Sequence, residues 1–86
     1  MKQFEYVVKA EEGLHARPAG ILAKEAKKYE SVVTIANESG KSADVTKLIR
    51  VMSLGVKCGQ TVTITVEGPD EETAAEEVKA FFEENF

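Results

Sequence analysis

The residues best suited to chemistry lie in one short stretch, Gly13 to Ala19, which contains a histidine and an arginine. His15 is the only histidine among the 86 residues, and Arg17 follows it by two positions. An imidazole can act as a nucleophile near neutral pH, and a guanidinium can bind two phosphate oxygens at once. This pairing predicts that His15 accepts a phosphoryl group and that Arg17 stabilises it.

The position of this stretch at the start of a predicted helix supports the same chemistry. Apolar residues recur with helical spacing at Ala19, Leu22, Ala23 and Ala26, and the pattern ends near Tyr29. His15 then lies at or near the N-cap, where unpaired backbone N–H groups form an anion site. Pro18 has no N–H group and suits the first turn, so the backbone amides of Ala16 and Arg17 are the expected phosphate donors.

The rest of the chain predicts four strands and two further helices around this stretch. The expected strands are 4–9, 31–36, 41–45 and 60–67, and the other helices are 47–54 and a last one beginning after Asp70, its expected N-cap. The order βαββαβα predicts a single α+β domain over residues 1–86, in which helices cover one face of a sheet.

Composition excludes several classes of function. The net charge is −4, which disfavours nucleic-acid binding, and no apolar run is long enough for membrane insertion or a signal peptide, so a cytoplasmic location is expected. With one His and a single cysteine, Cys58, neither a disulfide nor a His/Cys metal site is expected. Without a Walker-type loop or a carboxylate cluster for magnesium, no nucleotide or other cofactor is expected. The phosphoryl group would therefore pass from one protein to another.

Charge and apolar residues together predict a surface for those protein partners. Residues 13–57 carry a net charge of +4, whereas residues 67–86 carry −7. Helical geometry places Gly20, Ile21 and Lys24 on the face opposite the apolar stripe of the first helix, together with Arg17 and Lys28. In the second helix, Val51 and Leu54 are expected to face the core, and Leu48, Ile49 and Met52 the other side. These faces predict a docking site for acidic proteins; the alternative is a second helix wedged between layers.

Several motifs of the chain closely resemble those of the HPr family. They are Gly-Leu-His-Ala-Arg-Pro-Ala from Gly13, Val-Met-Ser-Leu-Gly from Val51, and the Thr-Val-Thr-Ile strand followed by Glu67-Gly68 and an acidic helix. HPr proteins are the histidine-containing phosphocarriers of the bacterial phosphoenolpyruvate:sugar phosphotransferase system. The resemblance implies an open-faced sandwich with a four-stranded antiparallel sheet and three helices on one side.

The resemblance also implies roles for individual residues. His15 would accept phosphate on Nδ1 from enzyme I and pass it to sugar-specific IIA proteins, with Arg17 assisting, and the two helix faces, including Lys47, would dock both partners. Such a protein is a relay rather than an enzyme with its own turnover, and a monomer is expected. In many Gram-positive members a regulatory serine caps the second helix at the position where this chain has Lys47. The neighbouring Thr46 has a hydroxyl that could cap this helix and is the candidate regulatory residue, but it is out of register by one position. Efficient modification by an HPr kinase is therefore not expected.

Two other functions are compatible with parts of this pattern. A regulatory module of the same fold could act by binding alone, although it would need no nucleophile at a helix N-terminus. A small hydrolase could use His15 as a general base, although no activated Ser or Cys lies near His15 in the sequence. Phosphoryl transfer through His15 uses more of the observed features than either alternative.

Overall fold

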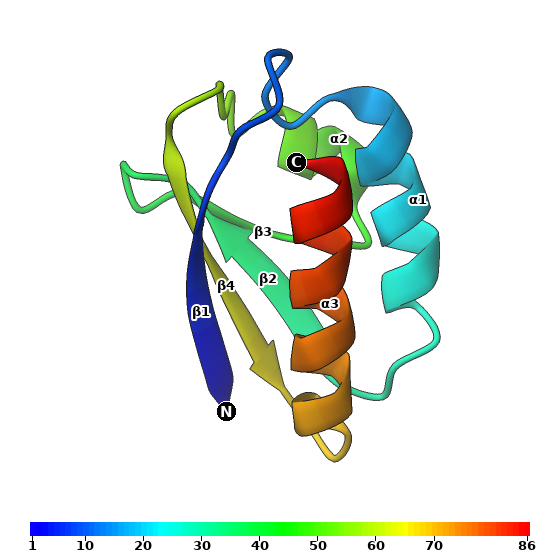
Figure 1. Ribbon diagram of the computed structural model, residues 1–86. Helices are drawn as coiled ribbons and strands as arrows, with labels where there is room; N and C mark the ends of the chain where they lie inside the picture. Colours follow the sequence, from blue (N-terminus) through cyan, green and yellow to red (C-terminus); the bar gives the residue numbers. More distant parts are fainter.

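The computed structural model describes residues 1–86 and contains four strands and three helices (Figure 1). The elements follow the predicted order βαββαβα. The strands are β1 (Lys2–Val7), β2 (Val32–Ala36), β3 (Ser42–Asp44) and β4 (Thr61–Glu67), and the helices are α1 (Ala16–Ala26), α2 (Leu48–Met52) and α3 (Glu71–Asn85). None of the three helices combines the length and the apolar character that crossing a membrane requires.

The four strands form one antiparallel sheet in the order β1-β4-β2-β3. Successive side chains of a strand point to opposite faces of the sheet. In β4, Val62, Ile64 and Val66 are completely buried on one face, while the threonines between them lie on the other. Figure 1 shows all three helices on one side of the sheet. The predicted open-faced sandwich is therefore confirmed.

The core lies between this sheet face and the apolar stripes of the helices. Phe82 of α3 is completely buried and packs edge-on against Phe4 and Tyr6 of β1, with ring centroids 6.5 and 5.6 Å apart. Burial of one such side chain contributes roughly 1.5–3 kcal/mol. Leu22 of α1 and Val51 of α2 are also buried, so each helix contributes to one shared core.

Helix α1 begins at Ala16, directly after His15, so the predicted N-cap position of His15 is confirmed. The carboxyl ends of α1 and α2 differ from the predicted ends. Helix α1 ends at Ala26, and the N–H groups of Lys27, Lys28 and Tyr29 donate to carbonyls three residues back, which closes the helix with tighter turns. Helix α2 ends at Met52 and is followed by Gly55 with a φ of 64°, a left-handed conformation that suits glycine.

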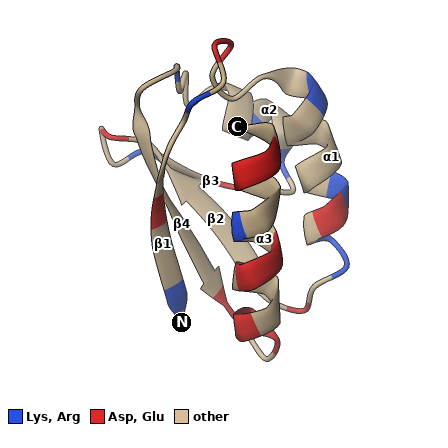
Figure 2. Ribbon diagram, in the orientation of Figure 1, with Lys and Arg blue, Asp and Glu red and all other residues tan.

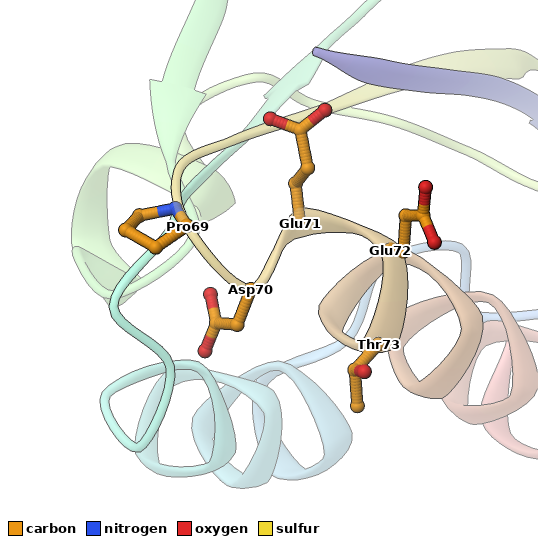
Figure 3. Close-up of a pocket in the computed structure, with 5 residues that line it drawn as sticks. All are labelled: Pro69, Asp70, Glu71, Glu72 and Thr73. Atoms are coloured by element: carbon orange, nitrogen blue, oxygen red, sulfur yellow. The ribbon is translucent and has the colours of Figure 1, made fainter.

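Asp70 is the N-cap residue of α3, as predicted, but its side chain makes no capping hydrogen bond to that helix. Its carboxylate instead accepts the backbone N–H groups of Glu30 and Ser31, at 3.0 and 2.9 Å, and the Ser31 hydroxyl. Figure 3 shows Asp70 and Glu71 pointing to opposite sides of the turn, and Glu71 accepts the Gly68 N–H at 3.2 Å. Asp70 thus joins the α1–β2 turn to the β4–α3 turn.

Candidate functional site

His15 is the N-cap residue of α1. Its backbone is extended, with φ −95° and ψ 161°, and its carbonyl accepts the first bond of the helix from the Ala19 N–H at 3.2 Å. The side chain is half-buried, and Nδ1 lies 3.2 Å from the carbonyl oxygen of Gly13. The imidazole therefore sits at the positive end of the helix, where the sequence placed it.

The backbone N–H groups of Ala16 and Arg17 remain available to a ligand. No carbonyl or side chain of the protein accepts a hydrogen bond from either group. Pro18, the next residue, has no N–H and is buried in the first turn. Since unpaired amides at a helix N-terminus favour anions, the local backbone suits a phosphoryl group carried by the adjacent imidazole.

His15 and Arg17 share one shallow hollow, the histidine hollow, which is lined by Glu12, His15, Ala16 and Arg17. Arg17 is exposed and takes part in none of the salt bridges of the fold. Its guanidinium can therefore approach phosphate oxygens without giving up a protein partner. Glu12 was not predicted to belong to the site, although its place three residues before His15 could have suggested it.

The loop that leads to His15 is fixed by Gly13. Its φ of 69° is a left-handed conformation, and a Cβ there would overlap the Val56 carbonyl oxygen and lie 2.9 Å from the Cα of Lys57. The next residue, Leu14, is buried and donates its N–H to the same Val56 oxygen at 3.2 Å. Only glycine fits this close approach, which anchors the backbone two residues before the imidazole.

A second hollow lies at the start of α3 and has the opposite electrostatic character (Figure 3). It is lined by Pro69, Asp70, Glu71, Glu72 and Thr73, so three carboxylates and no basic side chain surround it. These carboxylates repel a phosphate. The histidine hollow is therefore the better candidate for phosphoryl chemistry.

The predicted docking residues divide into exposed and partly buried ones. Ile21 on α1 is 49% exposed and Ile49 on α2 is 85% exposed, and the cations Lys24 and Lys47 are exposed beside them in sequence. Figure 2 shows basic residues on α1, whereas acidic residues recur along α3. The exposed apolar part of the predicted surface thus consists of two isoleucines on the basic side of the molecule.

The other predicted docking residues lie partly beneath that surface. Leu48 and Met52 are half-buried and pack against the core. Gly20 is half-buried and lies close to Leu48: a Cβ at Gly20 would be 3.9 Å from the Leu48 Cδ2 atom. The expectation that Gly20, Leu48 and Met52 face away from the core is wrong in part, since α1 and α2 pack against one another.

Thr46 does not lie at the N-cap of α2, which is Lys47. Its hydroxyl donates to the Asp44 carboxylate at 2.7 Å, and its backbone N–H donates to the same oxygen at 2.9 Å. A phosphoryl group on Thr46 would break this hydrogen bond and bring two negative groups together. Lys47 itself caps nothing with its side chain.

The open-faced sandwich, with a lone histidine at the N-cap of its first helix beside an unpaired arginine, is the architecture of a candidate phosphocarrier protein. A family model described as "PTS HPr component phosphorylation site" matches residues 2–84. The chain therefore belongs to the HPr family.

Individual relatives agree with this assignment. The phosphocarrier protein HPr of Mycoplasma genitalium is 42% identical over 85 residues, covering 99% of this chain and 97% of the relative. The solved structure of a histidine-containing phosphocarrier protein from Mycoplasma is 35% identical with a TM-score of 0.88, covering 93% of this chain and 90% of that one. A crystal structure of an HPr dimer from Thermoanaerobacter tengcongensis is 33% identical with a TM-score of 0.74, covering 98% and 95%. This kinship supports a phosphoryl-carrier role in the phosphotransferase system.

Proposed function

We propose that this protein accepts a phosphoryl group on His15 from enzyme I and delivers it to IIA proteins of sugar permeases, acting as a cytoplasmic monomer. The observation that carries the proposal is the setting of His15, which caps α1 next to two unpaired backbone amides and an unpaired guanidinium. Each of these three donors has a role once the imidazole carries a dianion.

The transfer is a substitution at phosphorus. A ring nitrogen of His15 uses its lone pair to form the N–P bond while the bond between phosphorus and the donor group breaks, and the donor keeps that electron pair. The Arg17 guanidinium and the amides of Ala16 and Arg17 stabilise the oxygens of the transferred group. The reverse substitution delivers the group to the next protein. The protein is thus a covalent relay without a bound cofactor.

Attack through Nδ1, which the family resemblance implies, requires the imidazole to leave its resting contact. A proton on Nδ1 would be donated to the Gly13 carbonyl oxygen 3.2 Å away, and the lone pair would then be on Nε2. For Nδ1 to attack, the proton must move to Nε2 and the Nδ1 lone pair must turn away from that oxygen. Both changes involve one side chain at an exposed rim and need no movement of α1.

Docking would use the basic side of the molecule near His15. Ile21 and Ile49 supply exposed apolar contacts, and Lys24 and Lys47 supply positive charge, with Gly20, Leu48 and Met52 shaping the surface beneath them. Apolar residues surrounded by cations fit a partner surface with apolar contacts and acidic side chains. Regulation by phosphorylation of Thr46 is not part of this proposal, because its hydroxyl is already bound to Asp44.

The test is phosphorylation with phosphoenolpyruvate and enzyme I, followed by intact mass measurement and acid treatment. Wild-type protein should gain one acid-labile phosphoryl group, His15→Ala should gain none, and two-dimensional ¹⁵N–³¹P spectroscopy should assign the group to Nδ1. Uptake that survives His15→Ala would refute the assignment to this residue. Absence of any uptake by the wild type would instead favour the regulatory module that acts by binding alone.

A further inference from the structure

The imidazole of His15 has an aromatic neighbour from the far end of the chain. The rings of His15 and Phe86 lie with their centroids 6.0 Å apart and at an interplanar angle of 87°. Perpendicular aromatic pairs at centroid distances of 4.5–7 Å are attractive, because the positive edge of one ring meets the negative face of the other. Phe86 is buried and is not among the four residues that line the histidine hollow.

The Phe86 ring is itself held firmly in place. It is only 4% exposed, and its centroid lies 5.0 Å from that of Phe82, which is completely buried. The backbone N–H of Phe86 donates to the Phe82 carbonyl at 2.8 Å, and its backbone oxygen accepts the N–H groups of Lys9 and Ala10 at 2.6 and 2.7 Å. Contacts to the core and to the segment after β1 therefore fix both the ring and its backbone.

His15, in contrast, has few restraints of its own. Its side chain makes a single hydrogen bond, the 3.2 Å contact between Nδ1 and the Gly13 carbonyl. One such bond to a ring nitrogen does not fix both side-chain torsions, and the proposed transfer through Nδ1 breaks it. The Phe86 ring remains beside the imidazole when that hydrogen bond breaks.

We propose that Phe86 is a positioning residue that limits the rotation of the His15 ring and keeps its reacting nitrogen toward the histidine hollow. The buried ring is a fixed aromatic neighbour that stays in place when the Gly13 hydrogen bond breaks. Productive transfer requires the nucleophile to be oriented nearly correctly before reaction, and a fixed neighbouring ring favours that orientation. This inference rests on the proposed function of His15 as phosphoryl acceptor.

The experiment compares Phe86→Leu with wild type in two measurements. The first is the single-turnover rate of phosphoryl uptake from phosphorylated enzyme I. The second is made without any partner and uses the ¹⁵N shifts and three-bond couplings of His15, which report its tautomer and side-chain rotamers. Leucine keeps an apolar side chain but removes the aromatic ring. We therefore expect an uptake rate about tenfold lower and His15 couplings that are averaged over several rotamers. Phe86→Tyr keeps the ring and should restore both readouts.

The matched control is Phe4→Leu. This substitution makes the same chemical change in an aromatic residue that contacts Phe82 but not His15. It should leave the uptake rate and the His15 couplings at wild-type values. Thermal unfolding confirms that each variant is folded, and Phe86→Met replaces Phe86→Leu if the latter is unfolded.

Three results would overturn the inference: a wild-type uptake rate in Phe86→Leu, unchanged His15 couplings in that variant, or an equal loss of rate in Phe4→Leu. Failure of the wild type to accept a phosphoryl group would refute the carrier function instead. In that case the couplings alone would decide whether Phe86 orients His15.

Discussion

In the proposed transfer, Arg17 is the residue that can be substituted with the least effect on the fold. It is exposed and forms no salt bridge, so the folded protein does not depend on its charge. Beside His15 in the same hollow, its guanidinium instead has the position to neutralise a phosphoryl group. A substitution there should therefore alter chemistry and leave stability nearly constant.

We predict that Arg17→Glu slows phosphoryl uptake by at least about tenfold. Loss of one charge-assisted hydrogen bond costs roughly 1.5–3 kcal/mol, and each 1.4 kcal/mol is a factor of ten in rate. The uptake rate is measured by rapid quench, and the thermal midpoint should stay close to that of wild type. Arg17→Lys, which keeps the charge without the fork, should fall between the two proteins. An uptake rate for Arg17→Glu equal to wild type would remove Arg17 from the mechanism.

The sequence identified His15 and Arg17 but missed two of their neighbours for different physical reasons. Glu12 lies close in sequence, yet its membership in the hollow depends on the turn that Gly13 makes. Phe86 is separated from His15 by nearly the whole chain, and it reads as part of the amphipathic pattern of the last helix. Only the packing of α3 beside α1 brings the two rings together.

At the scale of elements, the Asp70 carboxylate links two turns at the end of the sheet. The Ser31 hydroxyl, followed by the backbone N–H groups of Glu30 and Ser31, lowers the pKa of Asp70 below its ordinary value. The Gly68 turn is packed so closely that a Cβ there would lie 2.5 Å from the Cα of Ser31. Side-chain bonds and backbone packing thus hold the α1–β2 and β4–α3 connections together.

We predict that this junction adds to the loss of stability in acid. Because the folded pKa of Asp70 is lower than its unfolded value, its contribution is complete above the unfolded value, near 4, and is lost as pH falls through the folded pKa. Chemical denaturation between pH 2 and 7 should show a smaller acid-induced loss for Asp70→Asn than for wild type. An identical pH dependence in the two proteins would show that the junction has no role in it.

The elements themselves were largely predictable, whereas their ends were not. The alternation of apolar residues and threonine in β4 defined that strand almost to the residue. The end of α1 was predicted near Tyr29 because a local pattern does not separate the helix from the tighter turns that follow Ala26, and the side-chain contact of Asp70 was misjudged because N-caps and turn contacts use the same side chain. Such choices depend on tertiary neighbours that a local pattern does not contain.

For the whole molecule, charge is segregated between its helices. Basic residues lie on α1, and Lys47 is exposed at the start of α2, whereas acidic residues recur along α3 (Figure 2). An acidic partner is therefore attracted to α1 and to the start of α2 and repelled by α3, which raises the rate of productive encounter at low ionic strength. The exposed Ile21 and Ile49 lie on α1 and α2.

We predict that Ile49→Asp weakens the binding of enzyme I by at least about tenfold. The substitution removes the most exposed large apolar side chain of the protein and places a negative charge among cations. Isothermal titration calorimetry measures the dissociation constant. Val32→Asp makes a matched change at a residue of β2 that is 55% exposed, and it should bind like wild type. Equal weakening by both variants would assign the effect to net charge rather than to this surface.

In the proposed function, the shallowness of the histidine hollow limits the lifetime of a phosphoryl group on His15. Only four residues line the hollow and the imidazole is half-exposed. A phosphoryl group on the imidazole would therefore be open to bulk water as well as to a partner protein. An open rim permits delivery to several acceptors, but it offers no lid against hydrolysis. The phosphorylated protein would therefore be a short-lived intermediate. The fraction of phosphoryl groups delivered would depend on the rate of transfer to an acceptor relative to the rate of hydrolysis. That fraction would be set by the concentration of acceptor proteins rather than by shielding within the fold.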